Sequence, residues 1–344
     1  MGKIKPICFA NGDQTTGVIA KAVREILLPH IPMEEVDVSV ESRLETNDDC
    51  LKQAAKAFRR CGSGLKISTA SDDERIKKLE MGSANIMLRP LSGAFGMLRM
   101  TMAEGKYHNP VAVLRYGHGG FYDEQSCEVT TIEGRKTAVI TTHMDLEDIQ
   151  LFAKLACDIE KQYGFPIIAS SKWTIAKSEA LFMNEFKYWL DHYRREYKTE
   201  LTDIAIARIA KDNIGGWIRV FDNPNGDTAA DVADFVHGNN VMCSTVYCRD
   251  GYTYEELPGG TAPDKLGTDL KGENFFNPLI TIFGFANAIE AVNPEMSGFC
   301  KKVRKASLLY LDEVSAAKRS TYEMLHYVDN LLSDRSPEGI KRLA

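Results

Sequence analysis

The sequence predicts an α/β protein built around a large, mainly parallel sheet, and three observations support this class. Short apolar runs rich in β-branched residues alternate with segments whose apolar residues recur at helical spacing. No linker, low-complexity tract or internal repeat interrupts the alternation. The 344 residues are also enough for two domains or one elaborate α/β unit. Such alternation favours a layered α/β sandwich.

The strands are predicted from short apolar runs that end at turn residues. The first run is followed by Asn11-Gly12-Asp13, which starts a turn. Two runs joined by Glu133-Gly134 are expected to form a hairpin. The expected strands are, in order, 5–10, 65–69, 111–116 and 166–170, with the hairpin formed by 129–132 and 136–142.

The helices are predicted from apolar residues at three- and four-residue spacing and from capping signals. Ser71-Asp72-Asp73-Glu74 combines a capping residue with early acids, which is typical of a helix start. A long helix is expected over 146–163. The other expected helices are 16–28, 50–60, 179–196, 203–211, 227–237 and 277–292, with further helix after 307.

Charge and composition restrict the class of function. The formal net charge is −6, so no basic excess exists to release counterions from nucleic acid, and a nucleic-acid binder is not expected. No apolar stretch approaches the ~18–20 residues of a membrane span, and the first residues lack the apolar core of a signal peptide. We therefore expect a cytoplasmic protein without a membrane partner. The eight cysteines form no CxxC pair, which fits reduced thiols.

Three acids are candidates for a divalent-cation site. Asp227 and Asp231 are four residues apart, which places both carboxylates on one face of the expected helix, and Asp203 lies upstream of Gly215-Gly216. Mg²⁺ and Mn²⁺ prefer several oxygen ligands and leave positions open for a chelating substrate. The alternative from spacing alone is a solvated helix face with two mildly repelling acids.

Arginines and a glycine-rich turn point to an anionic substrate. Arg89, Arg99 and Arg115 follow Gly82-Ser83-Ala84-Asn85 within a short span, and guanidinium groups bind carboxylates through two hydrogen bonds. Arg115 ends an apolar strand and leads into the glycine-rich segment 116–122, where ligands approach the backbone closely. An ordinary surface position is the alternative for each arginine.

Two residues are candidates for proton transfer. Tyr122 ends the glycine-rich segment, where the sequence is compatible with a proton donor or with a buried structural tyrosine. Lys172 follows the strand expected over 166–170. A lysine beside a metal-bound alkoxide relays a proton when neighbouring positive charge lowers its pKa.

Together these motifs resemble the isocitrate dehydrogenases, within the wider family of metal-dependent decarboxylating β-hydroxyacid dehydrogenases that includes the isopropylmalate enzymes. The resemblance covers roughly residues 5 to 295 and is closest to the eukaryotic-type isocitrate branch. It implies an isopropylmalate dehydrogenase-like α/β/α sandwich without a G-x-G-x-x-G Rossmann motif. The motifs that carry it are Thr46-Asn47-Asp48, Ala54-Ala55-Lys56-Ala57, 66–74, 115–122, Ser171-Lys172-Trp173-Thr174, Asp227 with Asp231, and Gly260-Thr261-Ala262-Pro263-Asp264.

The resemblance implies a role for each matching residue. Tyr122 would protonate the enolate carbon after CO₂ leaves, and Lys172 from the partner subunit would handle the substrate hydroxyl proton. Asp203, also from the partner subunit, would join Asp227 and Asp231 around Mg²⁺ or Mn²⁺. The residues implied to hold the substrate carboxylates are Ser71, Ser83, Asn85, Arg89, Arg99 and Arg115, of which Arg99 departs from the family spacing by about one residue.

The resemblance also assigns a nicotinamide cofactor to the glycine-rich loop 260–264, which taken alone would be an ordinary turn. An acid at position 264 accepts hydrogen bonds from ribose hydroxyls and repels a 2′-phosphate, so NAD is expected in preference to NADP. Lys265, Lys211 and Arg208 are cations that could bind a phosphate instead. The implied cofactor-binding residues are Thr69, Gly260, Thr261, Asp264 and Asn277.

The implied organisation is a homodimer of two-domain subunits with shared active sites. A large domain would comprise residues 1–101 and 235–344, and a small domain residues 102–234, with a short dimer clasp at about 120–146. The dimer would be obligate, because one subunit would supply lysine and aspartate to the site of the other.

Departures from the family leave the substrate open. Ile86 and Met87 stand where eukaryotic-type relatives carry Gly-Thr, and Gly259 stands where they carry His. The expected reaction is oxidative decarboxylation of isocitrate or a close analogue to a 2-oxo acid. The first alternative is a biosynthetic homologue that acts on 3-phosphonomethylmalate or another substituted malate. The second is a non-catalytic regulatory subunit, although all five metal-binding and proton-transfer residues are present.

Overall fold

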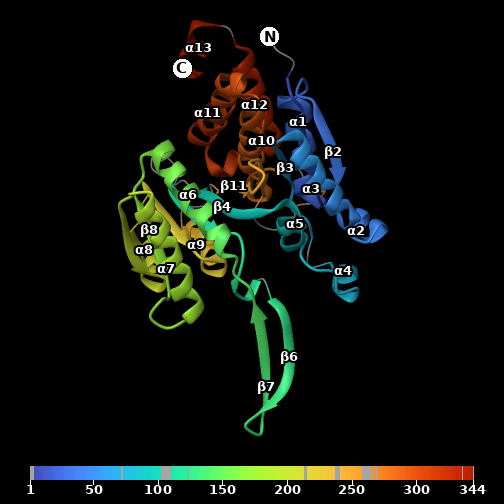
Figure 1. Cartoon of the computed structure of the whole chain (residues 1–344). Helices are drawn as coiled ribbons and strands as arrows, with labels where there is room; N and C mark the ends of the chain where they lie inside the picture. The colour runs from blue at the N-terminus through green and yellow to red at the C-terminus, as the bar shows by residue number, and fades with distance from the viewer. Residues whose placement is uncertain are drawn as a thin grey trace. The chain divides into compact units, whose positions relative to one another are not determined.

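The computed structural model describes residues 4–70, 73–101, 110–122, 124–212, 215–236, 241–257, 265, 267–268, 270–334 and 336–343. The chain divides into two compact units, and Figure 1 labels many of their elements. Unit 1 comprises Met1–Gly93, Val241–Val246 and Asp250–Ala344, and unit 2 comprises Ala94–Asn240 and Tyr247–Arg249. The domain limits implied by the resemblance stay a prediction.

Unit 1 is built on strands in the order β2-β1-β3-β12-β11. β1 pairs in parallel with β2 and β3, and β3 pairs in parallel with β12. The side chains of β1 and β3 are buried, apart from Asn11 at the end of β1. The strands are β1 (Ile7–Asn11), β2 (Met33–Asp37), β3 (Gly64–Lys66), β11 (Val241–Cys248) and β12 (Thr253–Glu256).

Helices with apolar faces pack around these strands. α1 (Gln14–Leu27) buries Ile19, Val23 and Leu27, which recur every four residues. α10 (Leu279–Val292) is buried along most of its length. The remaining helices of unit 1 are α2 (Val40–Thr46), α3 (Asp49–Cys61), α4 (Glu74–Lys78), α5 (Ala84–Ser92), α11 (Ser297–Glu313), α12 (Thr321–Ser333) and α13 (Pro337–Leu343).

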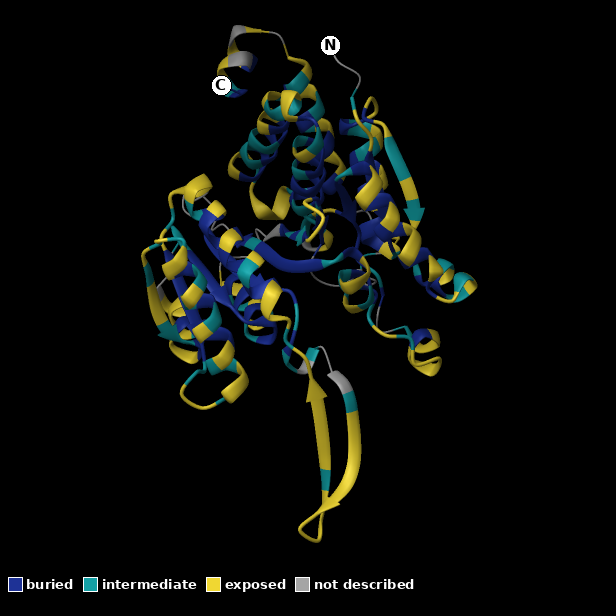
Figure 2. Cartoon of the chain, in the orientation of Figure 1, coloured by how far each residue is buried: buried dark blue, intermediate teal, exposed yellow. Residues whose placement is uncertain are grey.

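Unit 2 contains strands in the order β4-β5-β10-β8-β9. β5, β10, β8 and β9 pair in parallel, and β4 is antiparallel to β5. All residues of β5 and β8 are buried (Figure 2). The strands are β4 (Ala94–Thr101), β5 (Val111–Tyr116), β8 (Ile167–Ser171), β9 (Tyr197–Leu201) and β10 (Trp217–Phe221).

The helices of unit 2 bring polar residues to one edge of the parallel strands. Ala229, Ala230 and Ala233 of α9 pack into a core with Val113 and Phe221. The carboxyl ends of β5, β8 and β10 lie at the same edge, because parallel strands point the same way. The elements that follow or flank these strands are η1 (Gly120–Tyr122), α6 (Leu146–Tyr163), α7 (Lys177–His192), α8 (Thr202–Asp212) and α9 (Asn223–Val236).

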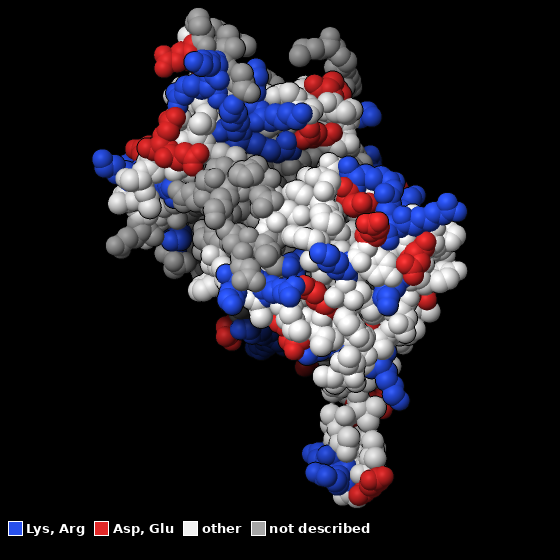
Figure 3. Space-filling model, turned by 90° about the vertical axis from the view of Figure 1, so that its left-hand side faces the viewer, with Lys and Arg blue, Asp and Glu red and all other residues white. Residues whose placement is uncertain are grey.

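The predicted hairpin is confirmed as β6 (Glu124–Ile132) and β7 (Arg135–Thr142). Glu133 and Gly134 both have positive φ angles, of 49° and 75°, as a two-residue hairpin turn requires. The residues of both strands are mostly exposed, and the pair is yellow in Figure 2. Figure 3 shows charged atoms at the tip of the hairpin.

The predicted α/β class with a mainly parallel sheet is confirmed, but several elements were not predicted. β4 contains Ala, Gly and Met residues of modest strand propensity, and Arg219 interrupts the short apolar run of β10. α9 begins at Asn223, four residues earlier than predicted, because the first turn of a helix tolerates Pro224. Among the helices that the structure describes, none is long and apolar enough to cross a membrane.

Candidate active site

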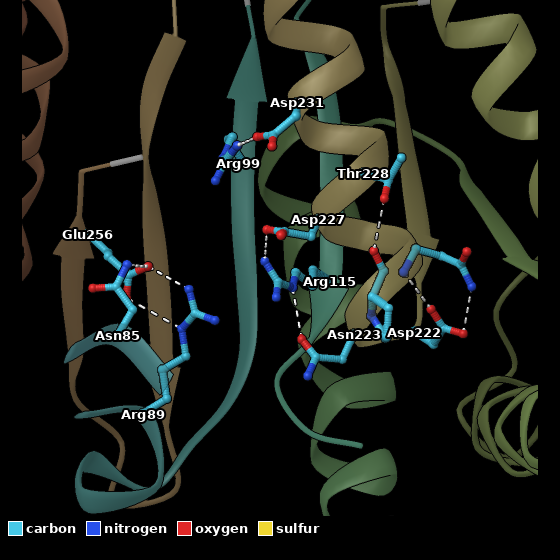
Figure 4. A network of polar contacts seen from close by, with 12 residues as sticks. Asn85, Arg89, Arg99, Arg115, Asp222, Asn223, Asp227, Thr228, Asp231 and Glu256 are labelled. Atoms are coloured by element: carbon cyan, nitrogen blue, oxygen red, sulfur yellow. Dashed lines mark hydrogen bonds and ion pairs between the residues drawn. The ribbon is translucent and has the colours of Figure 1, made fainter. Parts of the chain in front are cut away.

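Arg115 is the centre of a polar group in unit 2. It ends β5 and is almost fully buried beside the first turn of α9. Its Nε donates to Asn223 Oδ1 at 2.9 Å, and its Nη1 donates to Asp227 (Figure 4). Gly226 permits this approach, because a Cβ at that position would lie 2.7 Å from Arg115 Cγ. A buried guanidinium is strongly unfavourable without such partners.

Tyr122 belongs to the same group. Arg115 Cζ lies 5.5 Å from the centre of the Tyr122 ring, which is within cation–π range. Burial raises the pKa of Tyr122, and the negative charge of Asp227, with which the phenol is hydrogen-bonded, adds to the effect. Gly120 holds the turn against α9, since its φ is +69° and a Cβ there would lie 2.5 Å from Pro224 Cγ. Tyr122 therefore keeps its proton at neutral pH.

The two predicted metal-binding acids of α9 both contact arginines. Asp231 Oδ1 accepts from Arg99 Nη1 at 2.7 Å, and Arg99 also bonds Asp234 Oδ2 at 3.2 Å. Asp227 accepts from Arg115 (Figure 4). The side chain of Asp227 is 31% exposed and that of Asp231 is 71% exposed, so both carboxylates are accessible to a cation.

Lys172 and Asp203 lie together at the carboxyl edge of the parallel strands. Lys172 Nζ is 2.7 Å from Asp203 Oδ2, and this hydrogen bond lowers the pKa of Asp203. The resemblance assigns both residues to the partner's active site, and the structure shows that one chain presents them as a pair. Within the described part of the chain, no three His, Cys, Asp or Glu side chains lie close enough to form a metal site.

The chemistry of α9 nevertheless fits a hard divalent cation. Asp227 and Asp231 are accessible carboxylates one helical turn apart, and oxygen ligands of this kind suit Mg²⁺ and Mn²⁺. Arg115 and Arg99 neutralise them here. If these ion pairs opened, a bound cation would neutralise the two carboxylates, and an anionic substrate would neutralise the two arginines.

A second polar group lies in unit 1 and is centred on Glu256. Its carboxylate, which is almost fully buried, accepts from Arg89 Nη2 at 2.6 Å and from Asn85 Nδ2 at 3.1 Å (Figure 4). Asn85 and Arg89 are four residues apart on α5, so one helix face presents both. The structure therefore brings these two predicted substrate-binding residues together on an acid that was not predicted.

Lys66 extends this group and was also not predicted as a site residue. Its Nζ donates to Asn85 Oδ1 and, at 3.3 Å, to Thr69 Oγ1. Burial lowers the pKa of Lys66 to about 8, and the nearby Glu256 opposes this effect. A lysine within an apolar strand and an acid at the end of β12 were the signals available in the sequence.

The remaining predicted residues divide into two sets. Ser83 is the N-cap residue of α5, and Asn277 accepts from Leu279 N at 3.0 Å at the start of α10. Both residues are positioned by unit 1, and their assigned roles stay predictions. Ser71, Gly260, Thr261 and Asp264 lie outside the described residues. Their assigned roles stay predictions.

Comparison with known proteins supports the resemblance. A family model described as isocitrate/isopropylmalate dehydrogenase matches residues 14–326. The mitochondrial isocitrate dehydrogenase (NADP) of Saccharomyces cerevisiae is 24% identical over 339 residues, which cover 83% of this chain and 79% of that protein. A second isocitrate dehydrogenase (NADP) of the same yeast is 25% identical over 341 residues, covering 84% and 81%.

A solved structure confirms the fold. The isocitrate dehydrogenase from Ostreococcus tauri, in complex with isocitrate and magnesium(II), superposes with a TM-score of 0.82 at 18% identity. The match covers 95% of this chain and 99% of that chain. The predicted isopropylmalate dehydrogenase-like α/β sandwich is therefore confirmed, and the eukaryotic-type branch is supported by the yeast relatives.

The expectation that NAD is the preferred cofactor is wrong, because it conflicts with these relatives. The yeast enzymes and a mitochondrial enzyme of Aspergillus niger are all named as NADP-dependent. The expectation rested on a single acid, Asp264. One acid does not decide between the cofactors, because recognition of a 2′-phosphate depends on cations that other parts of the fold supply.

The family match over 14–326, the yeast relatives and the shared fold lead to one conclusion: this chain belongs to the isocitrate/isopropylmalate dehydrogenase family.

Proposed function

We propose that the protein oxidises and decarboxylates isocitrate, or a close 2-hydroxy polycarboxylate analogue, with NADP as the hydride acceptor and Mg²⁺ or Mn²⁺ as the metal. The observation that carries the proposal is the group of Arg115, Tyr122 and Asp227. It combines a carboxylate-binding cation, a protonated phenol and a metal-binding carboxylate in direct contact. Membership of the family and the NADP-dependent relatives support the reaction class and the cofactor.

The ion pairs of unit 2 suggest how these residues receive the substrate. Arg115 would exchange Asp227 for a substrate carboxylate, and Asp227 would exchange Arg115 for the cation. Arg99 and Asp231 would make the same exchange. Each exchange replaces one ion pair by another, so no charge is left uncompensated at the site.

The protein's own residues would then move protons. Lys172, held beside Asp203, would relay the proton of the substrate hydroxyl, giving up its own proton as it accepts that one, and Tyr122 would donate its phenolic proton to the carbon that loses CO₂. Lewis-acid stabilisation and hydride acceptance are the chemistry that the cation and the nicotinamide supply when bound. Asp203, Asp227 and Asp231 would hold the cation.

Initial rates test this function. NADP reduction is measured with isocitrate and Mn²⁺, with NAD in a parallel assay, for the wild type, Asp227→Asn and the control Asp158→Asn on the exposed surface of α6. We expect turnover with NADP that falls about 100-fold or more in Asp227→Asn and is unchanged in the control. A folded, Mn²⁺-binding protein that turns over no 2-hydroxy polycarboxylate would contradict the proposal and favour the regulatory-subunit alternative.

An isocitrate analogue is the second candidate substrate, and the observation that favours it is the first turn of α5. Ile86, which replaces a family glycine, lies next to Asn85 and is 47% exposed. An apolar side chain here changes the shape and hydration of the surface beside a substrate-binding residue. Rates with 3-phosphonomethylmalate, isopropylmalate and isocitrate discriminate these substrates. Higher kcat/KM for isocitrate than for either of the other two would reject the analogue.

We also propose that the active protein is a homodimer with shared sites. The hairpin of β6 and β7 supports a second copy, because Val129 and Ile140 are 63% and 54% exposed on a two-stranded ribbon. Such a ribbon is marginal in water without further packing. Val129 lies opposite Ala138 and Ile140 opposite Cys127, which places both apolar side chains on one face.

Complementation tests the sharing of sites. Lys172→Met and Asp227→Asn each inactivate a site, and the two variants are refolded together in equal amounts. With shared sites, the mixed dimers contain one intact site, so about one quarter of wild-type activity returns. If each chain supplies a complete site, the mixture stays as inactive as either variant alone, and the sharing is disproved.

A further inference from the structure

Two acids outside the candidate catalytic group meet behind Lys172. Glu179 lies in the first turn of α7, and Asp222 immediately follows β10. Their carboxyl groups are hydrogen-bonded to each other. β8 and β10 are parallel neighbours, with Ala169 opposite Val220, so Lys172 and Asp222 leave the sheet at the same edge.

Glu179 holds the backbone at Lys172. Its Oε2 accepts from Lys172 N and lies 3.1 Å from the hydroxyl of Ser171, which is completely buried. The carbonyl of Lys172 accepts from Ile175 N at 3.0 Å, which closes a turn on the other side. The peptide groups on both sides of the Lys172 Cα atom are therefore fixed. The direction in which the side chain leaves toward Asp203 follows from this backbone geometry.

Asp222 holds the start of α9. Its Oδ1 accepts from Asn225 N at 3.0 Å, and its Oδ2 accepts from Asn225 Nδ2 at 2.8 Å. Its carbonyl accepts from Gly226 N at 3.0 Å. These bonds define the first helical turn, which carries Asn223 and is followed by Asp227. Asn223 and Asp227 are the two partners of Arg115. Figure 4 shows Asp222 beside this turn.

The contact between the two carboxyl groups requires a shared proton. Two carboxylates in contact repel each other, and the repulsion is strong where water is excluded. Asp222 is only 8% exposed. Burial, followed by the charge of Glu179, raises the pKa of Asp222 to about 6. Below about pH 6, the proton on one carboxyl group forms the hydrogen bond to the other.

We propose that Glu179 and Asp222 are positioning residues that join the backbone of Lys172 to the first turn of α9 through a hydrogen bond between their carboxyl groups. Neither acid is assigned to the substrate, the cofactor or the metal. They act through Lys172 and through the helix that carries Asp227. The consequence for turnover rests on the proposed function, whereas the contact itself does not.

The contact is tested by amide hydrogen exchange in the full-length protein at about pH 5, where Asp222 keeps its proton. Glu179→Ala removes the acceptor of Lys172 N–H, and Glu179→Gln retains an acceptor and a donor toward Asp222. Glu185→Ala is the matched control, because Glu185 lies on the same helix, is similarly half-buried and accepts a hydrogen bond from Trp189 Nε1 at 2.9 Å, away from Lys172. We expect exchange of the Lys172 amide to rise about tenfold or more in Glu179→Ala and to stay at the wild-type rate in Glu179→Gln and in the control.

Kinetics test the functional consequence. We expect kcat to fall about tenfold in Glu179→Ala with KM for the substrate unchanged, and to recover in Glu179→Gln.

Variants of Asp222 test the other side of the contact by hydrogen exchange. Asp222→Asn can still donate to Glu179 and should keep the Lys172 amide protected, whereas Asp222→Ala should leave that amide less protected. Unchanged Lys172 exchange in Glu179→Ala overturns the contact, and raised exchange with unchanged kcat overturns the positioning role. An inactive wild type would contradict the proposed function alone, because the exchange experiment needs no turnover.

Discussion

Arg115 and Asn223 are joined by a hydrogen bond of 2.9 Å from Nε to Oδ1, and the amide nitrogen of Asn223 donates in turn to the carbonyl of Gly119 at 3.1 Å. One buried asparagine thus fixes the guanidinium and the glycine-rich turn that precedes Tyr122. The orientation of Arg115 and the position of Tyr122 are therefore coupled through a side chain that need not touch the substrate.

Replacement of Asn223 by alanine should weaken substrate binding. The substitution leaves Arg115 Nε and the Gly119 carbonyl without this partner, which costs about 1–3 kcal/mol per buried group. We expect a rise of roughly tenfold in KM for the substrate and a loss of stability in urea denaturation. Thr228→Ala on the same helix, which loses only a local bond to Pro224 O, is the control. Equal effects of the two substitutions would show that the coupling is unimportant.

Replacement of Tyr122 by phenylalanine should lower kcat about 100-fold, because general-acid catalysis contributes at least this much. Burial and Asp227 raise the pKa of Tyr122 above its ordinary value of 10.0, so the phenol stays protonated across the working range. The pH profile of wild-type kcat should therefore show no decline from Tyr122 ionisation between pH 6 and about 9. An alkaline limb in that range that disappears in Tyr122→Phe would contradict this prediction.

Replacement of Asp222 by asparagine should stabilise the protein at high pH. The pKa of Asp222 is raised from 3.8 to about 6, so its favourable contribution is complete below the ordinary value and is lost as pH rises through about 6. At about 1.4 kcal/mol per pH unit, the penalty at pH 8 is on the order of 3 kcal/mol. Urea unfolding of Asp222→Asn should thus exceed wild-type stability at pH 8 and converge with it near pH 4.

The exposed Asp158→Asn is the control for that experiment and should follow the wild type at every pH. A stability difference between Asp222→Asn and wild type that is the same at pH 5 and pH 8 would show that Asp222 does not titrate between folded and unfolded states in this range.

The hairpin predicts the assembly state. Replacing both Val129 and Ile140 by aspartate puts two charges on one apolar face of the ribbon, and charges are strongly disfavoured where a second copy would bury them. We expect sedimentation velocity to show monomers in place of dimers, together with lost turnover. Thr130→Asp, on the opposite face of the same strand, is the matched control. Dimers that persist in the double variant would exclude this face from the interface.

Much of the fold follows from local patterns. The helix over Leu146–Tyr163 and the hairpin were predicted from periodicity and from the Glu133-Gly134 turn, because both signals are contained in a few neighbouring residues. Strand β10 was missed, since Arg219 interrupts its short apolar run and the strand is defined mainly by its neighbours β5 and β8.

The sequence by itself determined the chemical types at the site: the arginines, the tyrosine, the lysine and the paired aspartates, together with the family motifs that order them. Only the tertiary structure decided which of them meet. It joined Arg115 to Asn223 and Asp227, and it placed Glu256 against Arg89 across more than 160 residues of chain. It also brought Glu179 and Asp222 together behind Lys172. The reason is physical: residue types and helical faces are local properties, whereas the partner of a buried charge is set by packing between segments that are distant in the chain.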